Sequence, residues 1–210
     1  ASYGRRFTVE LADGELVACV TRGKKGGAAC GDRVRIKYTG PDQGVIETIL
    51  PRRSLLYRSD AFREKVIAAN VTQIVIVLAA VPSFYEELVN RCLIAAESAE
   101  IKALIVLNKA DLKTETAHAM EKLALYRDLG YTLLTLSAHQ DTAPLLPYLQ
   151  SETSVLVGQS GMGKSSIINT LLPAVKAETR EISTTLDSGK HTTTHARLYH
   201  LNPDSHIIDS

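Results

Sequence analysis

The first part of the chain alternates apolar and polar positions over short runs, a pattern that predicts strands buried on one face. Four such runs cover 7–11, 16–20, 32–38 and 44–50, and turn residues separate them. Short strands at regular spacing with turns between them predict a small barrel. We expect an OB-fold-like β-barrel, with an SH3-like barrel as the alternative.

From residue 71 onward, continuous apolar runs alternate with segments of helical periodicity. The runs at 73–80, 103–107, 131–136 and 154–157 predict parallel strands buried on both faces. Helices are predicted at 86–99, 116–129, 142–149 and after Lys164, and closing strands at 196–201 and 206–208. The alternation predicts an α/β domain. We therefore expect a barrel at 1–57, a linker at 58–70 and an α/β domain at 71–210.

A glycine-rich loop follows the apolar strand at 154–157 and fits the pattern G-x-x-x-x-G-K-[ST]. The loop and the start of its helix are Gly158, Gln159, Ser160, Gly161, Met162, Gly163, Lys164, Ser165 and Ser166. In this strand–loop–helix setting, backbone N–H groups and the helix N-terminus bind phosphate oxygens. We expect Lys164 to reach the β- and γ-phosphates and to assist catalysis, and Ser165 to bind Mg²⁺.

Two further motifs follow buried strands and point to guanine. Asn108-Lys109-Ala110-Asp111 ends one strand and Ser137-Ala138 ends another. Asp111 can accept hydrogen bonds from N1–H and the 2-amino group of guanine, a donor pair that adenine lacks. Asn108 can hold the purine edge and neighbouring loops, the Lys109 stem can lie along the base, and a backbone N–H of Ser137-Ala138 can meet O6. Each motif is weak alone, but beside the phosphate loop they predict GTP.

The order of these motifs is unusual. Familiar GTPases have the phosphate loop first and the base-recognition motifs last, whereas here the base-recognition motifs come first. The phosphate loop follows, then the segment 189–194, and then Asp209. The order predicts a circularly permuted P-loop GTPase domain, which a sheet tolerates when the original termini lie close together. A small-molecule phosphotransferase remains the alternative, although it has no need of Asp111 with Ser137-Ala138.

Charge is unevenly distributed along the chain. Residues 1–70 contain 13 Lys/Arg and 8 Asp/Glu, a net charge of +5, while the remainder has −4 and the whole chain +1. Basic surface favours the phosphates of nucleic acids, and a solvated charged face is the alternative. The candidate RNA contacts are Arg5, Arg6, Lys24, Lys25, Arg33, Arg35, Arg52 and Arg53.

The cysteine pattern and the lengths of the apolar runs bear on the compartment. Cys19, Cys30 and Cys92 are widely spaced and form no C-x-x-C motif, which suits a reducing cytoplasm and argues against a disulfide framework or a zinc site here. The longest apolar run, 74–81, is too short to cross a bilayer. We expect a cytoplasmic protein that does not bind membranes.

Taken with the permuted order, three segments resemble the bacterial GTPases that depend on the small ribosomal subunit (RsgA/YjeQ type). They are 46–52 at the end of the barrel, Gly189-x-His191-Thr192-Thr193-Thr194, and 207–210, which is similar to the start of that family's D-[TS]-P-G segment. The resemblance covers essentially all 210 residues. It implies a monomeric GTPase that acts late in small-subunit assembly while its barrel docks on rRNA.

The resemblance also assigns roles and leaves alternatives. Thr193, or else Thr194, is expected to join Ser165 on Mg²⁺, while Asp209 acts through a water. His191 is expected to position the attacking water, or else only to pack the loop or contact the ribosome. The family usually continues into a zinc-binding Cys/His domain, so Zn²⁺ is expected only there and this chain is expected to be truncated. A GTP-gated RNA-binding switch with negligible turnover is the alternative function.

Overall fold

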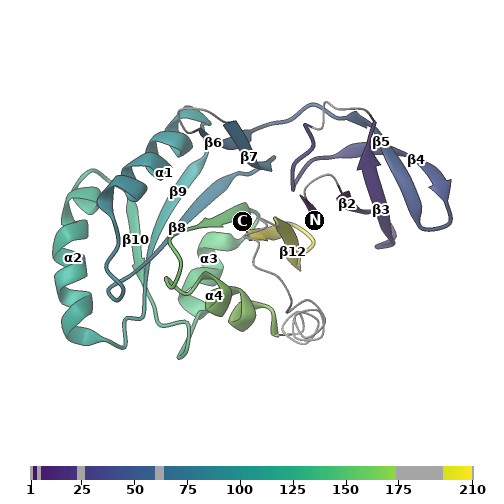
Figure 1. Ribbon diagram of the computed structural model, residues 1–210. Coiled ribbons are helices and arrows are strands. Elements are labelled where there is room, and N and C mark those ends of the chain that lie inside the picture. The colour runs from purple at the N-terminus through teal and green to yellow at the C-terminus, as the bar shows by residue number, and fades with distance from the viewer. Residues whose placement is uncertain (1, 4–5, 23–26, 60–63, 174–195, 210) are drawn as a thin grey trace.

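A six-stranded sheet forms the larger part of the molecule (Figure 1), in the order β10-β9-β8-β11-β13-β12. The computed structural model describes residues 2–3, 6–22, 27–59, 64–173 and 196–209. Neighbouring strands are parallel except β12, which pairs antiparallel with β13. The strands are β8 (Gln73–Ala79), β9 (Lys102–Asn108), β10 (Thr132–Thr135), β11 (Thr153–Val157), β12 (Arg197–Asn202) and β13 (Ser205–Asp209).

Helices cover both faces of this sheet, which explains its continuous apolar runs. Figure 1 shows α1 (Glu86–Ser98) and α2 (Lys113–Asp128) on one side, with α3 (Leu146–Leu149) and α4 (Lys164–Leu171) on the other. Every residue of β8 is buried, and a strand covered on both faces has no polar face to present. Hydrophobic burial on both sides therefore fixes the position of β8 at the centre of the domain.

A second, smaller sheet carries the N-terminal part, in the order β1-β2-β3-β5-β4. Its β3 and β5 are parallel and its other pairs antiparallel, a crossover suited to the partly open OB-fold barrel. The buried residues of its core are Phe7, Val17, Cys19 and Ile46. The strands are β1 (Ser2–Tyr3), β2 (Arg6–Glu10), β3 (Leu16–Thr21), β4 (Val34–Gly40) and β5 (Gln43–Ile49).

The segment between β3 and β4 joins the barrel to the rest of the molecule. Cys30 belongs to the large hydrophobic core and not to the barrel core, and its carbonyl accepts a hydrogen bond from the Ala69 N–H at 2.9 Å. Gly31 has φ +91°, and a Cβ atom there would lie 2.1 Å from the Ala69 carbonyl oxygen and 3.3 Å from Ile208 Cδ1. Only glycine allows this approach, so the junction depends on it.

Most predicted elements are present, and three differ. The segment expected as a linker at 58–70 contains β7 (Glu64–Ala69), which pairs antiparallel with β6 (Leu55–Ser59). The helix predicted at 116–129 begins earlier, at Lys113. The helix predicted at 142–149 divides into a 3₁₀ turn, η1 (Ala143–Leu145), and the short α3, because prolines interrupt its hydrogen bonding.

Within the described part of the chain, no helix has the length and apolar character that a membrane span requires.

Candidate functional site

The loops that carry the predicted motifs meet at one edge of the large sheet. They follow β9, β10 and β11, and these strands and β8 run parallel to one another. Their carboxyl ends therefore lie together, where open α/β sheets bind ligands. Asp209 ends β13, which pairs with β11 in the register Leu156↔Asp209, so this carboxylate lies beside the start of the phosphate loop.

Two glycines let the phosphate loop lie against its neighbours. A Cβ atom on Gly158 would be 2.2 Å from the Val77 carbonyl oxygen, and one on Gly163 would be 2.2 Å from Asn108 Nδ2. Gly163 also has φ +91° and is the N-cap of α4. Any side chain at these positions displaces the loop from β8 or from Asn108.

The Asn108 side chain joins two loops to the strand that carries it. Its Nδ2 donates to the Met162 carbonyl at 3.0 Å, and its Oδ1 accepts from the Ala138 N–H at 2.9 Å. Only 2% of Asn108 is exposed, and a buried amide that loses such partners is costly. The expected contact with neighbouring loops is present. The Ala138 N–H, however, already donates to Asn108 Oδ1, so it is not a free donor for guanine O6.

Asp111 lies at the exposed rim of the site, where the Ser137 hydroxyl donates to its Oδ1 at 2.5 Å. This hydrogen bond lowers the pKa of the Asp111 carboxyl, because an accepted hydrogen bond favours the charged form. The carboxylate is therefore ionised at neutral pH. Sequence alone did not link Ser137 to Asp111.

The Lys164 ammonium lies over the phosphate loop. It donates to the carbonyls of Gly158 at 2.7 Å and Gln159 at 3.0 Å. Burial lowers the pKa of Lys164, while the nearby Asp209 carboxylate acts in the opposite direction. The ammonium is thus held within the loop by weak neutral acceptors, and phosphate oxygens are stronger ones.

The oxygen donors beside this loop fit the hard cation Mg²⁺. Ser165 is the second residue of α4 and is exposed, and Asp209 is half-buried within electrostatic range of Lys164. Among the described residues no group of three His, Cys, Asp or Glu side chains gathers as a metal site. Mg²⁺ typically keeps waters and uses one or two protein oxygens with substrate phosphates, so a sparse donor set suits it.

Several predicted residues lie outside the described part of the chain. They include the expected water-positioning and metal-binding residues of 189–194 and some basic residues of the barrel. The residues concerned are His191, Thr193, Thr194, Arg5, Lys24 and Lys25.

Sequence reasoning missed the loop that follows β8. Its Val81 carbonyl accepts from Lys109 Nζ at 2.7 Å, and its Tyr85 N–H donates to Gln159 Oε1 at 3.1 Å. The loop thus touches both the base-recognition and the phosphate motifs. The available signal was its position, directly after a fully buried parallel strand.

The basic residues of the barrel separate into two groups. Arg6, Arg33, Arg35 and Arg53 are exposed, and Lys37, which sequence reasoning omitted, is exposed in the same alternating register along β4. Arg52 instead donates to both carboxylate oxygens of Asp32 at 2.7 Å, and this bond raises its pKa. Arg52 therefore forms an internal ion pair with Asp32.

Comparisons with known proteins agree with this arrangement. The sequence model of the RsgA GTPase family matches residues 49–210. The chain is 62% identical, over its whole length and 67% of the relative, to the small ribosomal subunit biogenesis GTPase RsgA of Nitrosospira multiformis. It is 55% identical to the protein of the same name from Neisseria meningitidis serogroup C, covering all of this chain and 68% of that relative.

Solved structures carry the same architecture. YjeQ from Thermotoga maritima superposes with a TM-score of 0.67 at 27% identity, over 98% of this chain and 70% of that one. YloQ, described as a circularly permuted GTPase, superposes with a TM-score of 0.61 at 28% identity, over 100% and 68%. The expected OB-fold-like barrel and circularly permuted P-loop domain are confirmed. The chain belongs to the RsgA GTPase family.

Proposed function

We propose that this GTPase acts in late maturation of the small ribosomal subunit, and that the subunit stimulates its turnover. The observation that carries the proposal is 62% identity, along the entire chain, to a relative named for small-subunit biogenesis. GTP, GDP and the small subunit with its rRNA are then its partners. We place the protein in the cytoplasm as a monomer.

In the proposed site the base and the phosphates are held from opposite sides of Asn108. Asp111 accepts from guanine N1–H and the 2-amino group, and the Lys109 stem, fixed at Val81, lies along the base. Backbone N–H groups of 158–166 and the Lys164 ammonium bind the phosphates. Because the Ala138 N–H is donated to Asn108, guanine O6 must share it or use the next N–H.

The proposed metal ligands are Ser165, Thr193 and, through a water, Asp209, with Thr194 as the alternative to Thr193. When bound, Mg²⁺ supplies charge stabilisation at the β- and γ-phosphates. Lys164 adds a second positive charge there. We assign His191 to the attacking water, because an imidazole can orient or deprotonate water near neutral pH.

The proposed rRNA contacts lie on the exposed face of β4 and its surroundings. Arg35 and Lys37 are two residues apart, so they project from one side of the edge strand β4, and Arg33 directly precedes this strand. Arg5, Arg6, Lys24, Lys25 and Arg53 complete the proposed basic surface. Arg52 contributes through the barrel structure, because it holds Asp32.

Replacing Asp111 by Asn should exchange nucleotide preference. The amide replaces the acceptor for the 2-amino group of guanine by an N–H donor, which matches the 2-oxo group of xanthine. Affinity for GTP should fall roughly 10²-fold, the scale of losing charged hydrogen bonds, and affinity for XTP should rise. Competition binding measures both, with Asp128→Asn on α2 as a remote control. Unchanged GTP binding by Asp111→Asn would remove Asp111 from the site.

Replacing Ser165 by Ala should abolish the dependence of tight GTP binding on Mg²⁺, because the hydroxyl ligand is lost. Titration of GTP with and without the metal measures this. Ser166→Ala, one residue further along α4, should behave as the parent. Ser165 has no metal role if its variant keeps the parent's Mg²⁺ dependence.

The function itself is tested by GTP turnover in the presence of purified ribosomal subunits. Small subunits should accelerate hydrolysis and large subunits should not. His191→Ala should cut the stimulated rate by roughly 10²-fold without changing GTP affinity, and His118→Ala on α2 should have no effect. Equal turnover with both subunits would contradict the proposed function, and full stimulation of His191→Ala would assign catalysis elsewhere.

Docking of the barrel on RNA should be electrostatic. Reversing Arg33 and Arg35 to Glu should weaken binding to small subunits and reduce the slope of log affinity against log salt by roughly two, one for each lost phosphate contact. The control reverses Lys113 and Lys122 on α2, an equal change of charge far from the barrel. If both pairs weaken docking alike, the effect is one of net charge and the proposed surface is wrong.

A further inference from the structure

The outer face of the barrel carries apolar side chains where a solvated sheet would carry polar ones. On β3, Leu16 is 60% exposed and Val20 is 46% exposed, and Ala18 between them is also exposed. Side chains alternate along a strand, so these three project from one face while Val17 and Cys19 fill the barrel core on the other. Apolar side chains exposed in a continuous row indicate a binding surface.

The register of the strands extends this row across the sheet. Val20 pairs with Arg6 on β2 and with Val45 on β5. Val45 in turn pairs with Lys37 on β4, and paired residues project from the same face. Four neighbouring strands thus present a cation, two valines and a second cation. Three strand spacings, about 14 Å, separate the backbones that carry the two cations.

The next row along the strands has polar side chains on both sides of a small apolar one. Ala18 pairs with Thr8 on β2 and with Gln43 on β5. Gln43 is exposed, and its amide can both donate and accept hydrogen bonds. On β2 to β5 no aromatic side chain projects from this face, because Phe7 and Tyr38 belong to the opposite set of alternating positions. The face therefore lacks the rings on which the bases of a single strand stack.

The cations of this face are available to a partner, whereas its carboxylates are engaged. Three exposed cations form no ion pair with the described residues. They are Arg6, Arg35 and Lys37. Glu47, in contrast, lies 4.0 Å from Arg22, and Glu10 lies 2.8 Å from His200 Nε2. The charge left over on the face is positive, which complements phosphate.

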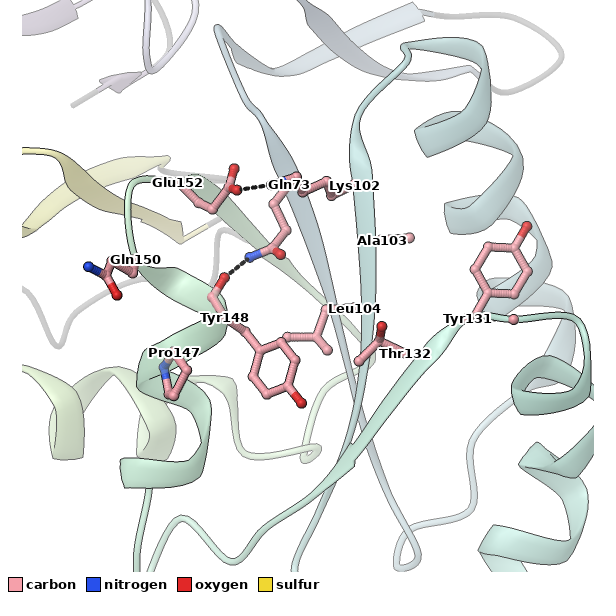
Figure 2. Close-up of a pocket in the computed structure, with 11 residues that line it drawn as sticks. Gln73, Lys102, Ala103, Leu104, Tyr131, Thr132, Pro147, Tyr148, Gln150 and Glu152 are labelled. Carbon is pink, nitrogen blue, oxygen red and sulfur yellow. Dashed lines mark hydrogen bonds and ion pairs between the residues drawn. The ribbon is translucent and has the colours of Figure 1, made fainter.

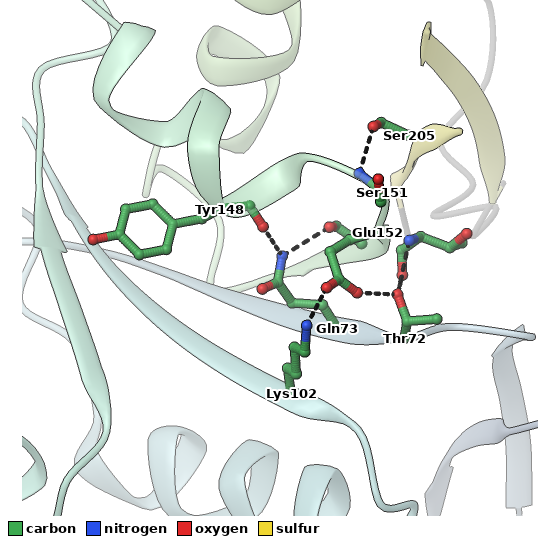
Figure 3. Close-up of polar contacts among 9 residues, drawn as sticks. Thr72, Gln73, Lys102, Tyr148, Ser151, Glu152 and Ser205 are labelled. Carbon is green, nitrogen blue, oxygen red and sulfur yellow. Dashed lines mark hydrogen bonds and ion pairs between the residues drawn. The ribbon is translucent and has the colours of Figure 1, made fainter. Parts of the chain in front are cut away.

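The edge of the large sheet opposite the nucleotide site provides a contrast. It has a cleft (Figure 2) whose lysine, Lys102, pairs with Glu152. Glu152 also accepts from the Thr72 hydroxyl at 2.5 Å (Figure 3). The charge of this lysine is therefore neutralised, whereas the cations of the barrel face remain to attract phosphates.

We propose that the outer face of the barrel binds an RNA double helix across its minor groove. In A-form RNA this groove is wide and shallow, and it exposes ribose 2′-hydroxyls beside the phosphate backbones. The apolar row can lie against the riboses, and Gln43 can hydrogen-bond a 2′-hydroxyl. Arg6 and Lys37 stand on opposite sides of the row, toward the two backbones. The inference rests on the proposed function, because it specifies the form of rRNA that the barrel contacts.

The test uses the whole chain with GDP and Mg²⁺ bound. It compares an RNA duplex, the DNA duplex of the same sequence and one of the RNA strands alone. The RNA duplex should bind most tightly, and the DNA duplex roughly two- to tenfold more weakly, the scale of one or two lost hydrogen bonds. In ¹⁵N-labelled protein, the RNA duplex should shift the amide signals of Ala18, Val20 and Lys37.

Three variants separate the face from the rest of the barrel. Ala18→Glu should weaken binding of the RNA duplex roughly tenfold or more, because it sets a carboxylate against the phosphate backbones. Ala18 is exposed, so the longer side chain needs no space in the core. Ala12→Glu, in the exposed turn between β2 and β3, makes the same change of charge and should bind as the parent. Gln43→Ala should reduce the preference for the RNA duplex over the DNA duplex.

Three outcomes would contradict the proposal. A single RNA strand that binds as tightly as the duplex overturns the double helix as ligand, and duplex binding that survives Ala18→Glu overturns the face. If no RNA binds while Ala18→Glu still weakens docking on small subunits, the partner is a protein of the subunit. None of these readouts depends on GTP hydrolysis, so failure here leaves the turnover test with ribosomal subunits unaffected.

Discussion

The buried side-chain amide of Asn108 is the interaction on which the nucleotide site depends. It connects the end of β9 to the phosphate loop through Met162 and to the following loop through Ala138. Gly163 is glycine because this amide occupies the space where a Cβ atom would lie. A residue of the base-recognition motif thus shapes the phosphate loop, and we infer that the two parts of the site are organised together.

The nucleotide site can form although the motifs occur in a permuted order along the chain. The carboxyl ends of parallel strands meet at one edge whatever order the chain visits them. The permuted order does change which segments lie next to the nucleotide site. Asp209 lies beside the phosphate loop, while the preceding Ile208 lies under Gly31 of the barrel. A single short strand, β13, therefore touches both the nucleotide site and the barrel junction.

The central sheet and the phosphate loop could be predicted from the sequence because strong local patterns determine both. The continuous apolar run of β8 and the glycine spacing at 158–163 each leave few alternatives. Pairings between side chains that are far apart along the chain could not be predicted from the sequence. The sequence does not show that Arg52 pairs with Asp32, nor that the segment expected as a linker, 58–70, contains a strand that pairs with β6. Lys37 could have been predicted as a further exposed basic residue, since it continues the alternation of Arg33 and Arg35.

The most direct test of the coupling is amide hydrogen exchange in Asn108→Ala without nucleotide. Removing the side chain leaves the Met162 carbonyl and the Ala138 N–H without their partner, and such buried losses cost about 1–3 kcal/mol. We predict faster amide exchange at Ala138 and across the phosphate loop together, with protection of β8 unchanged. Faster exchange at Ala138 with a phosphate loop that exchanges as in the parent would contradict it.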